Sequence, residues 1–271
     1  MSRDEHENKA GATGIHERVS AQFGAAAAAY TTSATHSDPE ALRKIVDLAR
    51  LKPTDVALDI ATGAGHTALA LAPYVAKVVA YDMTDEMLAE TRRNAAARGL
   101  ANVETRQGIA ESLPFPDATF DIVTVRQAPH HFADVPAAVR EMARVAKPGA
   151  RVLVIDSMSP EDDSLERQWN HIEKLRDPSH VRNLRPSEWR SVVAAAGLKI
   201  VFEEVGWATE NGRPMDFAAW IRRINTPPAA AAEVTRLFRE ASPALVAALH
   251  IETIDGALFF SVPQITLVAT K

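Results

Sequence analysis

Cysteine is absent from this chain of 271 residues, which excludes disulfide frameworks, thiolate nucleophiles and cysteine-ligated metal sites. An excess of positive charge is also lacking, because 30 lysines and arginines stand against 35 aspartates and glutamates, for a net charge of −5. Attraction to nucleic acid therefore does not organise the chain. No apolar run is long enough for a membrane span, and residues 1–14 are polar and acidic, unlike a signal peptide. We expect a cytoplasmic protein with no membrane span and no nucleic-acid partner.

The sequence does contain enough apolar material for one large α/β domain, because 46% of its residues are hydrophobic and 24% are charged. Residues 1–14 show no apolar periodicity, and we expect them to be disordered. A single domain is predicted over residues 15–271, and residues 15–50 form its N-terminal helical lid. Within this lid, Ser37, Asp38 and Pro39 supply the cap and first turn of a helix over residues 41–49.

Short apolar runs alternate with helical patterns between residues 54 and 156, which we predict to be the cofactor-binding core. The runs cover residues 56–60, 78–81, 103–107, 121–125 and 151–156. Strands that alternate with helices at this spacing predict an α/β fold with a Rossmann-like, doubly wound, mostly parallel sheet. Such sheets bind their ligands at the carboxyl ends of the strands.

The alternation ends after Asp156. Residues 157–197 and 213–250 are mainly helical and polar, while residues 198–205 and the apolar runs at the end of the chain predict further strands. The expected total is seven strands in the sheet. We interpret the two helical stretches as lid inserts that shape a substrate pocket, because neither one has enough apolar residues for a core of its own.

The loop after the first predicted strand is the strongest local signal. It reads DIATGAGHT over residues 59–67, where Gly63 and Gly65 permit a tight turn and a close approach between strand and helix. Asp82 ends the second predicted strand about 20 positions later, at the offset where an acid hydrogen-bonds a ribose. The loop and this acid together predict an adenosine-type cofactor.

The identity of the cofactor depends on charge, because Gly63, Gly65 and Ala68 also fit a loose dinucleotide fingerprint. A pyrophosphate binds bare backbone N–H groups and the positive end of a helix. Asp59, at the mouth of the loop, would repel phosphate and attract an ammonium or a sulfonium group. The loop therefore favours S-adenosylmethionine over NAD.

With these motifs, the chain resembles the class I S-adenosylmethionine-dependent methyltransferases, in the subgroup that includes ubiquinone/menaquinone-type C-methyltransferases. The resemblance runs from about residue 20 to residue 271 and includes QGIAESLPF (107–115), FDIVT (120–124) and AKPGARVL (146–153). It implies that the first acid and its loop hold the methionine part of the cofactor, that the second acid binds the ribose, and that neighbouring residues contact the adenine. The implied cofactor residues are Asp59, Ala61, Thr62, Gly63, Gly65, Asp82, Met83, Gly108, Ile109 and Ala110.

Two positions depart from the family's usual pattern. Ala61 stands where the family usually has a glycine, a mild change if φ is negative there. Ile109 stands where the family usually has an aspartate. Ile109 can pack on an adenine but cannot accept a hydrogen bond from its amino group, so the affinity rests more on the ribose contact.

Methyl transfer from a sulfonium depends mainly on positioning and desolvation, and a general base is needed only if the acceptor must lose a proton. The segment RQAPHHF (126–132) follows the fourth predicted strand, at the edge of the sheet where the methyl group should lie. We expect Arg126 and Gln127 to line the cofactor site. His130 and His131 are the candidate catalytic bases, but adjacent residues face different directions, so at most one faces the substrate. Packing within the turn is the alternative for either histidine.

Two further clusters are candidates for the substrate side. Tyr30, Ser33 and His36 share a spacing of three and resemble the N-terminal lid element of related methyltransferases, although they could simply pack on the sheet. The string RDPSHVR (176–182) is similar to one in family members, which implies that His180 and Arg182 reach the substrate chamber or pair with the lid. A solvated charged face is the alternative for this string. No metal centre is expected, since no spaced histidine pair accompanies the carboxylates.

The predicted function is transfer of a methyl group from S-adenosyl-L-methionine to an oxygen, nitrogen or carbon of a small-molecule acceptor, with S-adenosyl-L-homocysteine as the product. An acidic chain with lid inserts suits an enclosed small molecule better than a nucleic acid. Two alternatives stay open. One is a protein of the same fold that binds the cofactor without methylating, as a sensor or for a sulfonium-assisted rearrangement, and the other is an NAD-dependent oxidoreductase. The oligomeric state, including a homodimer, is also open.

Overall fold

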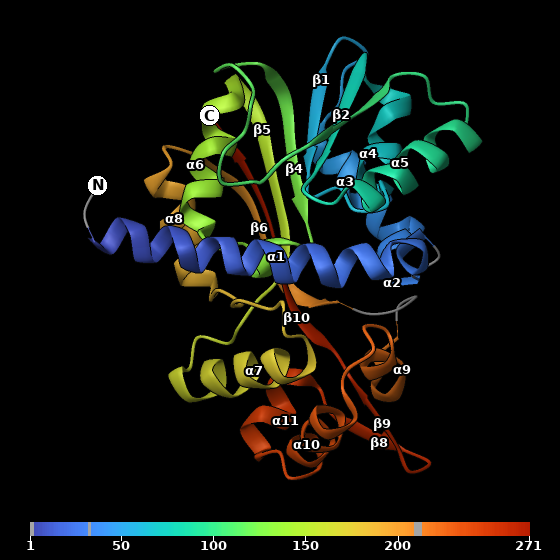
Figure 1. Cartoon of the computed structure of the whole chain (residues 1–271), viewed down its shortest axis with the longest axis vertical. Coiled ribbons are helices and arrows are strands. Elements are labelled where there is room, and N and C mark those ends of the chain that lie inside the picture. The colour runs from blue at the N-terminus through green and yellow to red at the C-terminus, as the bar shows by residue number, and fades with distance from the viewer. Residues whose placement is uncertain (1–2, 32–33, 209–212) are drawn as a thin grey trace.

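A computed structural model of the chain describes residues 3–31, 34–208 and 213–271, with the backbone alone for residues 3–10, 25, 26, 28–30, 34 and 35. Its centre is a seven-stranded sheet in the order β3-β2-β1-β4-β5-β10-β6 (Figure 1). The strands are β1 (Val56–Ile60), β2 (Lys77–Asp82), β3 (Val103–Gln107), β4 (Phe120–Arg126), β5 (Ala146–Ser157), β6 (Lys199–Ala208) and β10 (Val262–Thr270). All neighbouring strands are parallel except at β10, which is antiparallel to both β5 and β6. The predicted fold class is confirmed.

The strand order reverses between β1 and β4, which lie side by side although β2 and β3 come between them in the chain. In the register of these strands, Asp59 lies beside Ala80 on one side and Thr124 on the other. The carboxyl ends of the strands at such a switch point form a crevice in which open α/β sheets bind their ligands. The motifs found in the sequence thus meet at one edge of the sheet.

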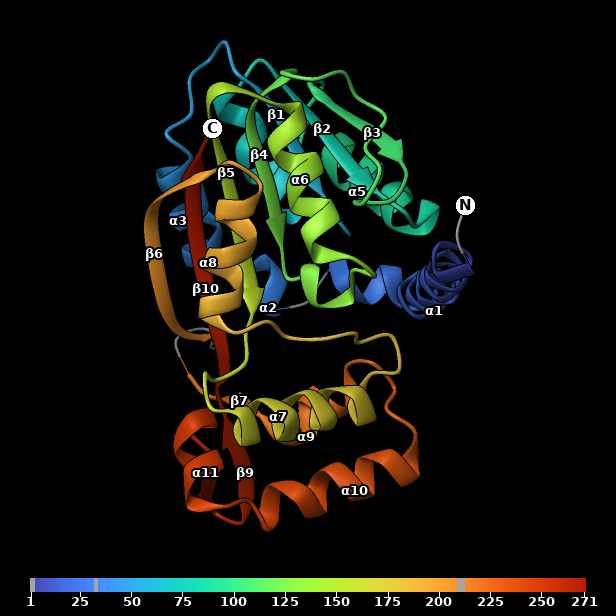
Figure 2. The same cartoon turned by 90° about the vertical axis from the view of Figure 1, so that its left-hand side faces the viewer.

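Helices cover both faces of the sheet. On one face, α3 (Pro39–Ala49) packs against β5 and α4 (His66–Leu71) packs against β1 and β2, with α5 (Asp85–Ala97) next to β2 and β3. Alanine, leucine and isoleucine side chains of α3 and α4 are buried in the same cluster. On the other face, α6 (Val135–Val145) and α8 (Pro186–Ala195) pack on the sheet (Figure 2). The predicted helix over 41–49 is confirmed as α3, and the carboxylate of Asp38 accepts a hydrogen bond from the backbone N–H of Glu40 at 2.9 Å.

The position of α8 corrects the prediction that residues 157–197 form a lid insert. Trp189 and Val193 of α8 are buried in the same hydrophobic cluster as the central strands and α6. α8 is therefore the helix between β5 and β6 in the wound sheet. The sequence did not predict this position, because α8 has many polar and charged residues and only one narrow face of the helix is apolar.

A third hydrophobic cluster lies below the carboxyl ends of the strands, and we call the part of the chain around it the lower lobe (Figure 1). It comprises α7 (Asp163–Arg176), α9 (Phe217–Arg222), α10 (Pro228–Arg239) and α11 (Pro243–Leu249), with a small sheet of β7 (Met215–Asp216), β9 (Ala257–Phe260) and β8 (Glu252–Ile254). Trp169 and Trp220 stack there, and Phe260 packs against both. The sequence predicts that neither insert has a core of its own, and in the structure apolar side chains from both inserts and from the end of the chain combine into one shared core.

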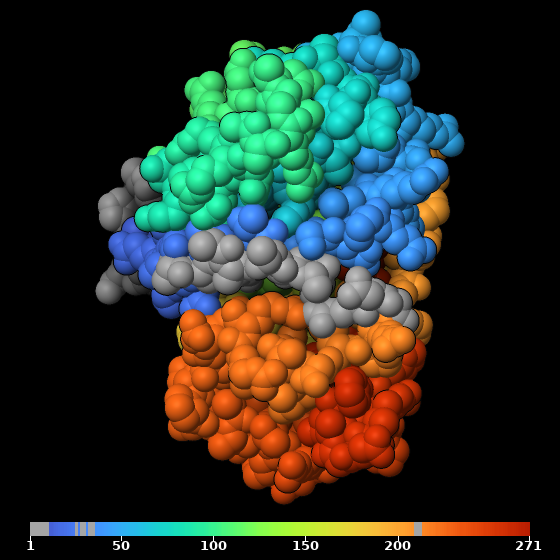
Figure 3. All heavy atoms as spheres, turned by 90° about the vertical axis from the view of Figure 1, so that its right-hand side faces the viewer, coloured from blue at the N-terminus to red at the C-terminus, as the bar shows by residue number. Residues whose placement is uncertain are grey.

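The N-terminal helix α1 (Arg3–Thr31) includes residues 3–14 of the segment that the sequence predicts to be disordered, and residues 1 and 2 lie outside the described residues. Val19 and Ala27 are buried, so the helix is held by its second half, and each further residue then adds a backbone hydrogen bond at little cost. α1 crosses the carboxyl ends of the strands and lies between the sheet and the lower lobe (Figures 1 and 3), followed by the short helix α2 (Ala34–Ser37). In the described part of the chain, none of the helices has the length and apolar character of a membrane span.

Candidate functional site

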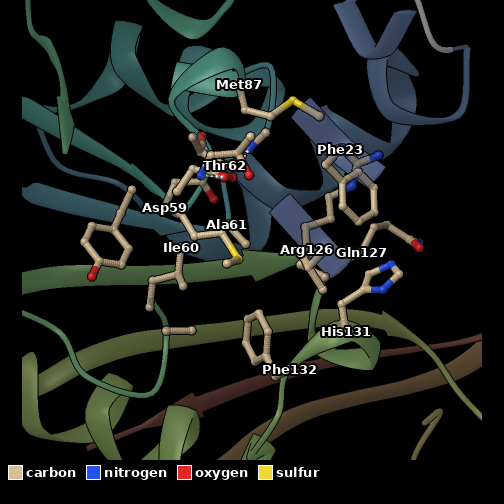
Figure 4. Close-up of a pocket in the computed structure, with 18 of the residues that line it drawn as sticks. Phe23, Asp59, Ile60, Ala61, Thr62, Met87, Arg126, Gln127, His131 and Phe132 are labelled. Carbon is tan, nitrogen blue, oxygen red and sulfur yellow. Dashed lines mark hydrogen bonds between the residues drawn. The ribbon is translucent and has the colours of Figure 1, made fainter. Parts of the chain in front are cut away.

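A pocket at the carboxyl ends of β1, β2 and β4 is closed on one side by α1 (Figure 4), and we call it the loop pocket. Its empty volume is about 970 Å³, part of it open to solvent. Most of the residues predicted to bind the cofactor line it, namely Asp59, Ala61, Thr62, Gly63, Asp82, Met83, Gly108, Ile109, Ala110, Arg126 and Gln127. Gly65 is the predicted residue outside the described lining.

The two glycines of the loop have different tasks. Gly63 has a φ of +55° and lies at the pocket surface, where its carbonyl accepts a hydrogen bond from Thr91 Oγ1 at 2.7 Å. Gly65 has a φ of +90° and begins α4, and a Cβ there would lie 2.9 Å from the side chain of Thr91. Gly65 therefore lets the loop pack against α5 behind the pocket.

Ala61 is in the left-handed region with a φ of +52°. Alanine would be a mild replacement for the family's glycine only if φ were negative, and here φ is positive. For a residue with a Cβ, this conformation costs about 1 kcal/mol or more. Ala61 is a strained position inside the pocket lining, held there by the surrounding loop.

Asp59 is fully buried at the base of the loop pocket and is tied to three parts of the fold. Its carboxylate accepts hydrogen bonds from Thr62 Oγ1 at 2.6 Å, Ala68 N at 3.1 Å and Thr124 Oγ1 at 2.7 Å. Burial raises the pKa of Asp59 to about 6, and these hydrogen bonds limit the rise. A carboxylate can accept about four hydrogen bonds, so Asp59 keeps a site for a donor or cation in the pocket.

Asp82 is fixed at the end of β2 by the backbone around it. Gly63 N donates to Oδ2 and Thr84 N donates to Oδ1, both at 2.9 Å. Burial raises the pKa of Asp82, and the backbone hydrogen bonds oppose this effect. The carboxylate lines the loop pocket, where it is placed to accept hydrogen bonds from two neighbouring hydroxyl groups.

Arg126 brings a partly buried positive charge to the same pocket from the end of β4. Its Nη1 donates to the carbonyl of His36 at 2.9 Å. Burial lowers the pKa of Arg126, and the negative charge of Asp59 acts against that shift. The loop pocket thus presents the buried carboxylate of Asp59 and the partly buried guanidinium of Arg126 within electrostatic reach of each other.

Several lining residues were not predicted. Three lie on α1, because the sequence predicts a helix there but does not show which face of it points into the pocket. Phe23, one of these three, contacts the ring of His131 edge-on, with 4.9 Å between the ring centroids (Figure 4). The unpredicted lining residues are His16, Val19, Phe23, Ile60, Ala64, His66, Thr67, Tyr81, Thr84, Met87, Glu111, Ala128 and Phe132. The lining residues that follow β1, β2 and β4 lie at the same edge of the sheet as the predicted residues, so the topology could have predicted them.

A second cavity, with an empty volume of about 680 Å³, lies beside the loop pocket and reaches into the lower lobe, and we call it the histidine cavity. Phe23, His36, Gln127 and His131 line both cavities, so the two meet at these side chains. Its other lining residues are His130, Ser157, Glu173, Arg176, Asp177, His180, Ala208, Met215, Trp220, Arg223, Ile224 and Val262. Charged side chains and the apolar surface of the lower lobe therefore share one space.

His130 lines the histidine cavity and forms a close pair with Asp156. The distance from His130 Nδ1 to Asp156 Oδ1 is 2.6 Å, and Ser157 Oγ lies 3.1 Å from the same nitrogen. Asp156 and two further carboxylates raise the pKa of His130, although burial opposes them. With Nδ1 held by the carboxylate, Nε2 is the nitrogen that can accept a proton from a bound molecule. Asp156 was missed, although β4 and β5 are adjacent parallel strands whose ends must lie close together.

His131 has a different environment from His130. Its ring packs against Phe23, and its Nδ1 lies 3.3 Å from Ser179 Oγ. Burial lowers the pKa of His131 to about 3, with a further contribution from neighbouring His130. His131 is therefore neutral at physiological pH, and it forms part of the wall between the two cavities.

Comparison with known proteins adds independent observations. A family model described as a methyltransferase domain matches residues 58–154. The uncharacterized methyltransferase YcgJ of Bacillus subtilis is 42% identical over 199 residues, which cover 73% of this chain and 76% of YcgJ. The crystal structure of YcgJ superimposes with a TM-score of 0.79 at 37% identity, covering 86% of this chain and 98% of that one. The chain belongs to the class I S-adenosylmethionine-dependent methyltransferases.

Other relatives match over a shorter part of the chain. The demethylmenaquinone methyltransferase of Thermus thermophilus is 43% identical over 120 residues, covering 44% of this methyltransferase and 54% of the Thermus protein. The aligned part is about half of either chain. This alignment therefore leaves more than half of the chain unmatched.

The predicted lid and insert residues have different positions in this methyltransferase. His36 lines both cavities, whereas Ser33 and the side chain of Tyr30 lie outside the described residues. His180 is buried, lines the histidine cavity and has its Nε2 3.1 Å from Asn170 Oδ1. Burial lowers the pKa of His180 far below its ordinary value.

Arg182 is the predicted insert residue that lies outside both described cavity linings. It forms ion pairs with Glu166 at 3.0 Å and with Glu188 at 2.8 Å. These pairs join α7 to α8, so the charge of Arg182 is used within the fold. Within the described residues, no three histidine, aspartate or glutamate side chains gather as a metal site would require.

The strain at Ala61 makes a prediction about stability. Ala61→Gly should raise the free energy of unfolding by about 1 kcal/mol, and Tm by roughly 2–4 °C, because glycine adopts a positive φ without a steric penalty. Thermal unfolding of the ligand-free enzyme would measure the change. Ala70→Gly, in the helical part of α4, is the matched control and should lower stability by about 1 kcal/mol. A fall in Tm for Ala61→Gly would show that the loop does not strain this residue.

Proposed function

We propose that this methyltransferase binds S-adenosylmethionine in the loop pocket and transfers its methyl group to a small molecule in the histidine cavity. The observation that carries the proposal is the junction of the two cavities, where Phe23, His36, Gln127 and His131 line both. The two bound molecules would therefore lie on either side of the same four side chains. Methyl transfer requires the two reacting atoms to approach each other directly, so the proposal includes a path between these side chains.

The residues of the loop pocket fit the parts of this cofactor. Asp59 and Arg126 carry opposite charges, which match the ammonium and carboxylate groups of a methionine moiety. Asp82, at the end of β2, can accept hydrogen bonds from the two ribose hydroxyls. Ile109 and Met87 offer apolar surface for the adenine. When bound, S-adenosylmethionine supplies an activated methyl group, because its sulfonium makes a good leaving group.

A dinucleotide fits the same residues less well. Arg126 is the one lysine or arginine among the described residues that line the loop pocket, while Asp59, Asp82 and Glu111 are acids. A pyrophosphate close to the loop would meet the carboxylate of Asp59, which is unfavourable in a buried site. This charge distribution supports S-adenosylmethionine over NAD.

His130 is the group that would take a proton from the acceptor. Asp156 holds its Nδ1, so the ring is oriented and the imidazolium that forms on proton transfer is stabilised. The apolar side chains of Met215, Trp220 and Val262 line the same cavity and would keep water away from the reacting atoms. The arrangement suits a compact acceptor with an ionisable hydroxyl, amine or carbon acid.

The first experiment tests binding and turnover together. Purified enzyme is incubated with labelled S-adenosylmethionine and a metabolite extract, and formation of S-adenosylhomocysteine is measured. We expect product with the wild-type enzyme, and no measurable cofactor binding by calorimetry for Asp82→Ala, because the ribose hydroxyls lose their acceptor.

Three results would count against this function. Unchanged affinity in Asp82→Ala would contradict the assignment of the ribose site. Binding without turnover across a broad range of acceptors would favour the non-methylating alternative. Energy transfer from the protein to bound NADH would favour an oxidoreductase.

The raised pKa of Asp59 makes cofactor binding depend on pH. The pKa of Asp59 is about 6, so at a lower pH the carboxyl group is protonated and no longer attracts the ammonium group. The affinity for S-adenosylhomocysteine, which carries the same ammonium, should therefore fall by about tenfold from pH 7.5 to pH 5. Calorimetry at several pH values measures this change. Asp59→Asn should bind weakly at both pH values, and a wild-type affinity independent of pH would contradict the role of Asp59.

The pair of His130 and Asp156 makes a prediction about rate. Because the carboxylate raises the pKa of His130, the methylation rate of an acceptor found in the first experiment should increase with pH through an inflection above about 6.5. His130→Gln should reduce kcat by about 10²- to 10⁴-fold, and Asp156→Asn should move the inflection to lower pH. His171→Gln, at an exposed position of α7, is the control and should leave the profile unchanged. The same inflection in Asp156→Asn as in the wild type would show that another group titrates.

A further inference from the structure

Two polar side chains from distant parts of the chain meet at one end of the loop pocket. His16 comes from α1, and Glu111 comes from the segment after β3. Their side chains are 21% and 13% exposed, and His16 Nε2 lies 3.5 Å from Glu111 Oε2. Both residues line the pocket, so a bound molecule would meet them together.

The hydrogen-bonding capacity of this pair is incompletely used. His16 Nε2 is buried, and it has no hydrogen-bond partner in the part of the chain that the structure describes. Glu111 Oε1 accepts hydrogen bonds from Ala133 N at 2.9 Å and Asp134 N at 3.4 Å, which holds Glu111 in place with Oε2 toward His16. A buried polar atom without a partner costs roughly 1–3 kcal/mol, so this end of the pocket gains from a ligand with a complementary donor and acceptor.

The neighbours of the pair identify which part of a ligand lies there. Ile109 and Ala110 precede Glu111 in the chain and line the pocket beside it. This is the turn where the bound adenine is expected, and Ile109 has no side-chain acceptor for an amino group. The backbone carbonyl of Ile109 already accepts a hydrogen bond from Tyr81 Oη at 3.1 Å. Recognition of the base edge therefore needs polar groups from other residues.

We propose that His16 and Glu111 recognise the adenine of the cofactor. Glu111 Oε2 accepts a hydrogen bond from the exocyclic amino group, and His16 Nε2 donates a hydrogen bond to a neighbouring ring nitrogen. An adenine edge presents this combination of one donor and one acceptor. The inference rests on the proposed function, since it assumes S-adenosylmethionine in the loop pocket, and it adds a determinant of base specificity.

The placement of His16 on α1 links base recognition to the position of that helix. Val19 and Phe23 of α1 line the same pocket, and Gln22 Nε2 donates to the carbonyl of Ile224 in the lower lobe at 3.1 Å. A hydrogen bond from His16 to the adenine would therefore add to the contacts that hold α1 between the sheet and the lower lobe. Cofactor binding and docking of α1 then support each other.

The test compares two ligands that differ only at the base edge. S-adenosylhomocysteine has an amino group on the ring, whereas S-inosylhomocysteine has a carbonyl oxygen there and cannot donate to Glu111. Calorimetry on the full chain measures the affinity for each. We expect the wild type to prefer the adenine compound by about ten- to hundredfold, because the inosine carbonyl would face a carboxylate.

Variants separate recognition from folding. His16→Leu should lose about tenfold or more in affinity for S-adenosylhomocysteine without a loss of Tm in the ligand-free protein, because leucine removes an unpartnered nitrogen. Glu111→Gln keeps an oxygen for Ala133 N and places an amide donor toward the base, so its preference should shift toward the inosine compound. Glu17→Gln, at the neighbouring exposed position of α1, should behave as the wild type.

The possible failures have different meanings. If the wild type binds neither compound, the cofactor assignment itself fails. If the wild type binds S-adenosylhomocysteine and His16→Leu and Glu111→Gln keep both its affinity and its base preference, the cofactor assignment stands and this inference is wrong.

Discussion

The buried carboxylate of Asp59 is the constraint on which the rest of the site depends. It accepts hydrogen bonds from the loop at Thr62, from the first turn of α4 at Ala68 and from β4 at Thr124. One side chain thereby fixes a loop, a helix and the neighbouring strand at the point where the strand order reverses. Its burial makes the charged form costly, and the same burial strengthens its attraction to any cation that enters the pocket.

Charges of the two cavities follow a common pattern of paired groups at the ends of adjacent strands. Asp59 and Arg126 come from β1 and β4, while Asp156 comes from β5 and His130 from the turn after β4. A buried ion is tolerated where a partner offsets its desolvation, so each pair keeps a reactive or binding group charged inside the protein. The neutral rings of His131 and Phe23 stand between the pairs.

The sheet could be predicted from the sequence because parallel strands buried on both faces leave continuous apolar runs, as in residues 56–60 and 121–125. Residues at the ends of those strands followed from the topology, as Asp59, Asp82 and Arg126 show. Contacts that depend on three-dimensional packing could not be predicted. The lower lobe combines apolar side chains from Trp169 to Val262, and no single stretch among them has the pattern of a core.

The direction in which a side chain points also could not be predicted from the sequence. A helical region over residues 15–50 could be recognised, but the face on which His16, Val19 and Phe23 lie is decided by where the helix docks. Arg182 shows the converse, because its charge looked suited to a substrate and instead pairs with Glu166 and Glu188. The φ of Ala61 is likewise a property of the closed loop, since alanine by itself favours the opposite sign.

The place of β10 between β5 and β6 has a consequence for how the chain folds. β6 is hydrogen-bonded to β10 and not to β5. It therefore cannot join the sheet until β10, which lies more than 50 positions further along the chain, has paired with β5. The whole of the lower lobe after β6 lies within the loop that this pairing closes. Closing so long a loop is entropically expensive and slow, so the sheet should grow from β1, β2 and β4 and acquire β6 last.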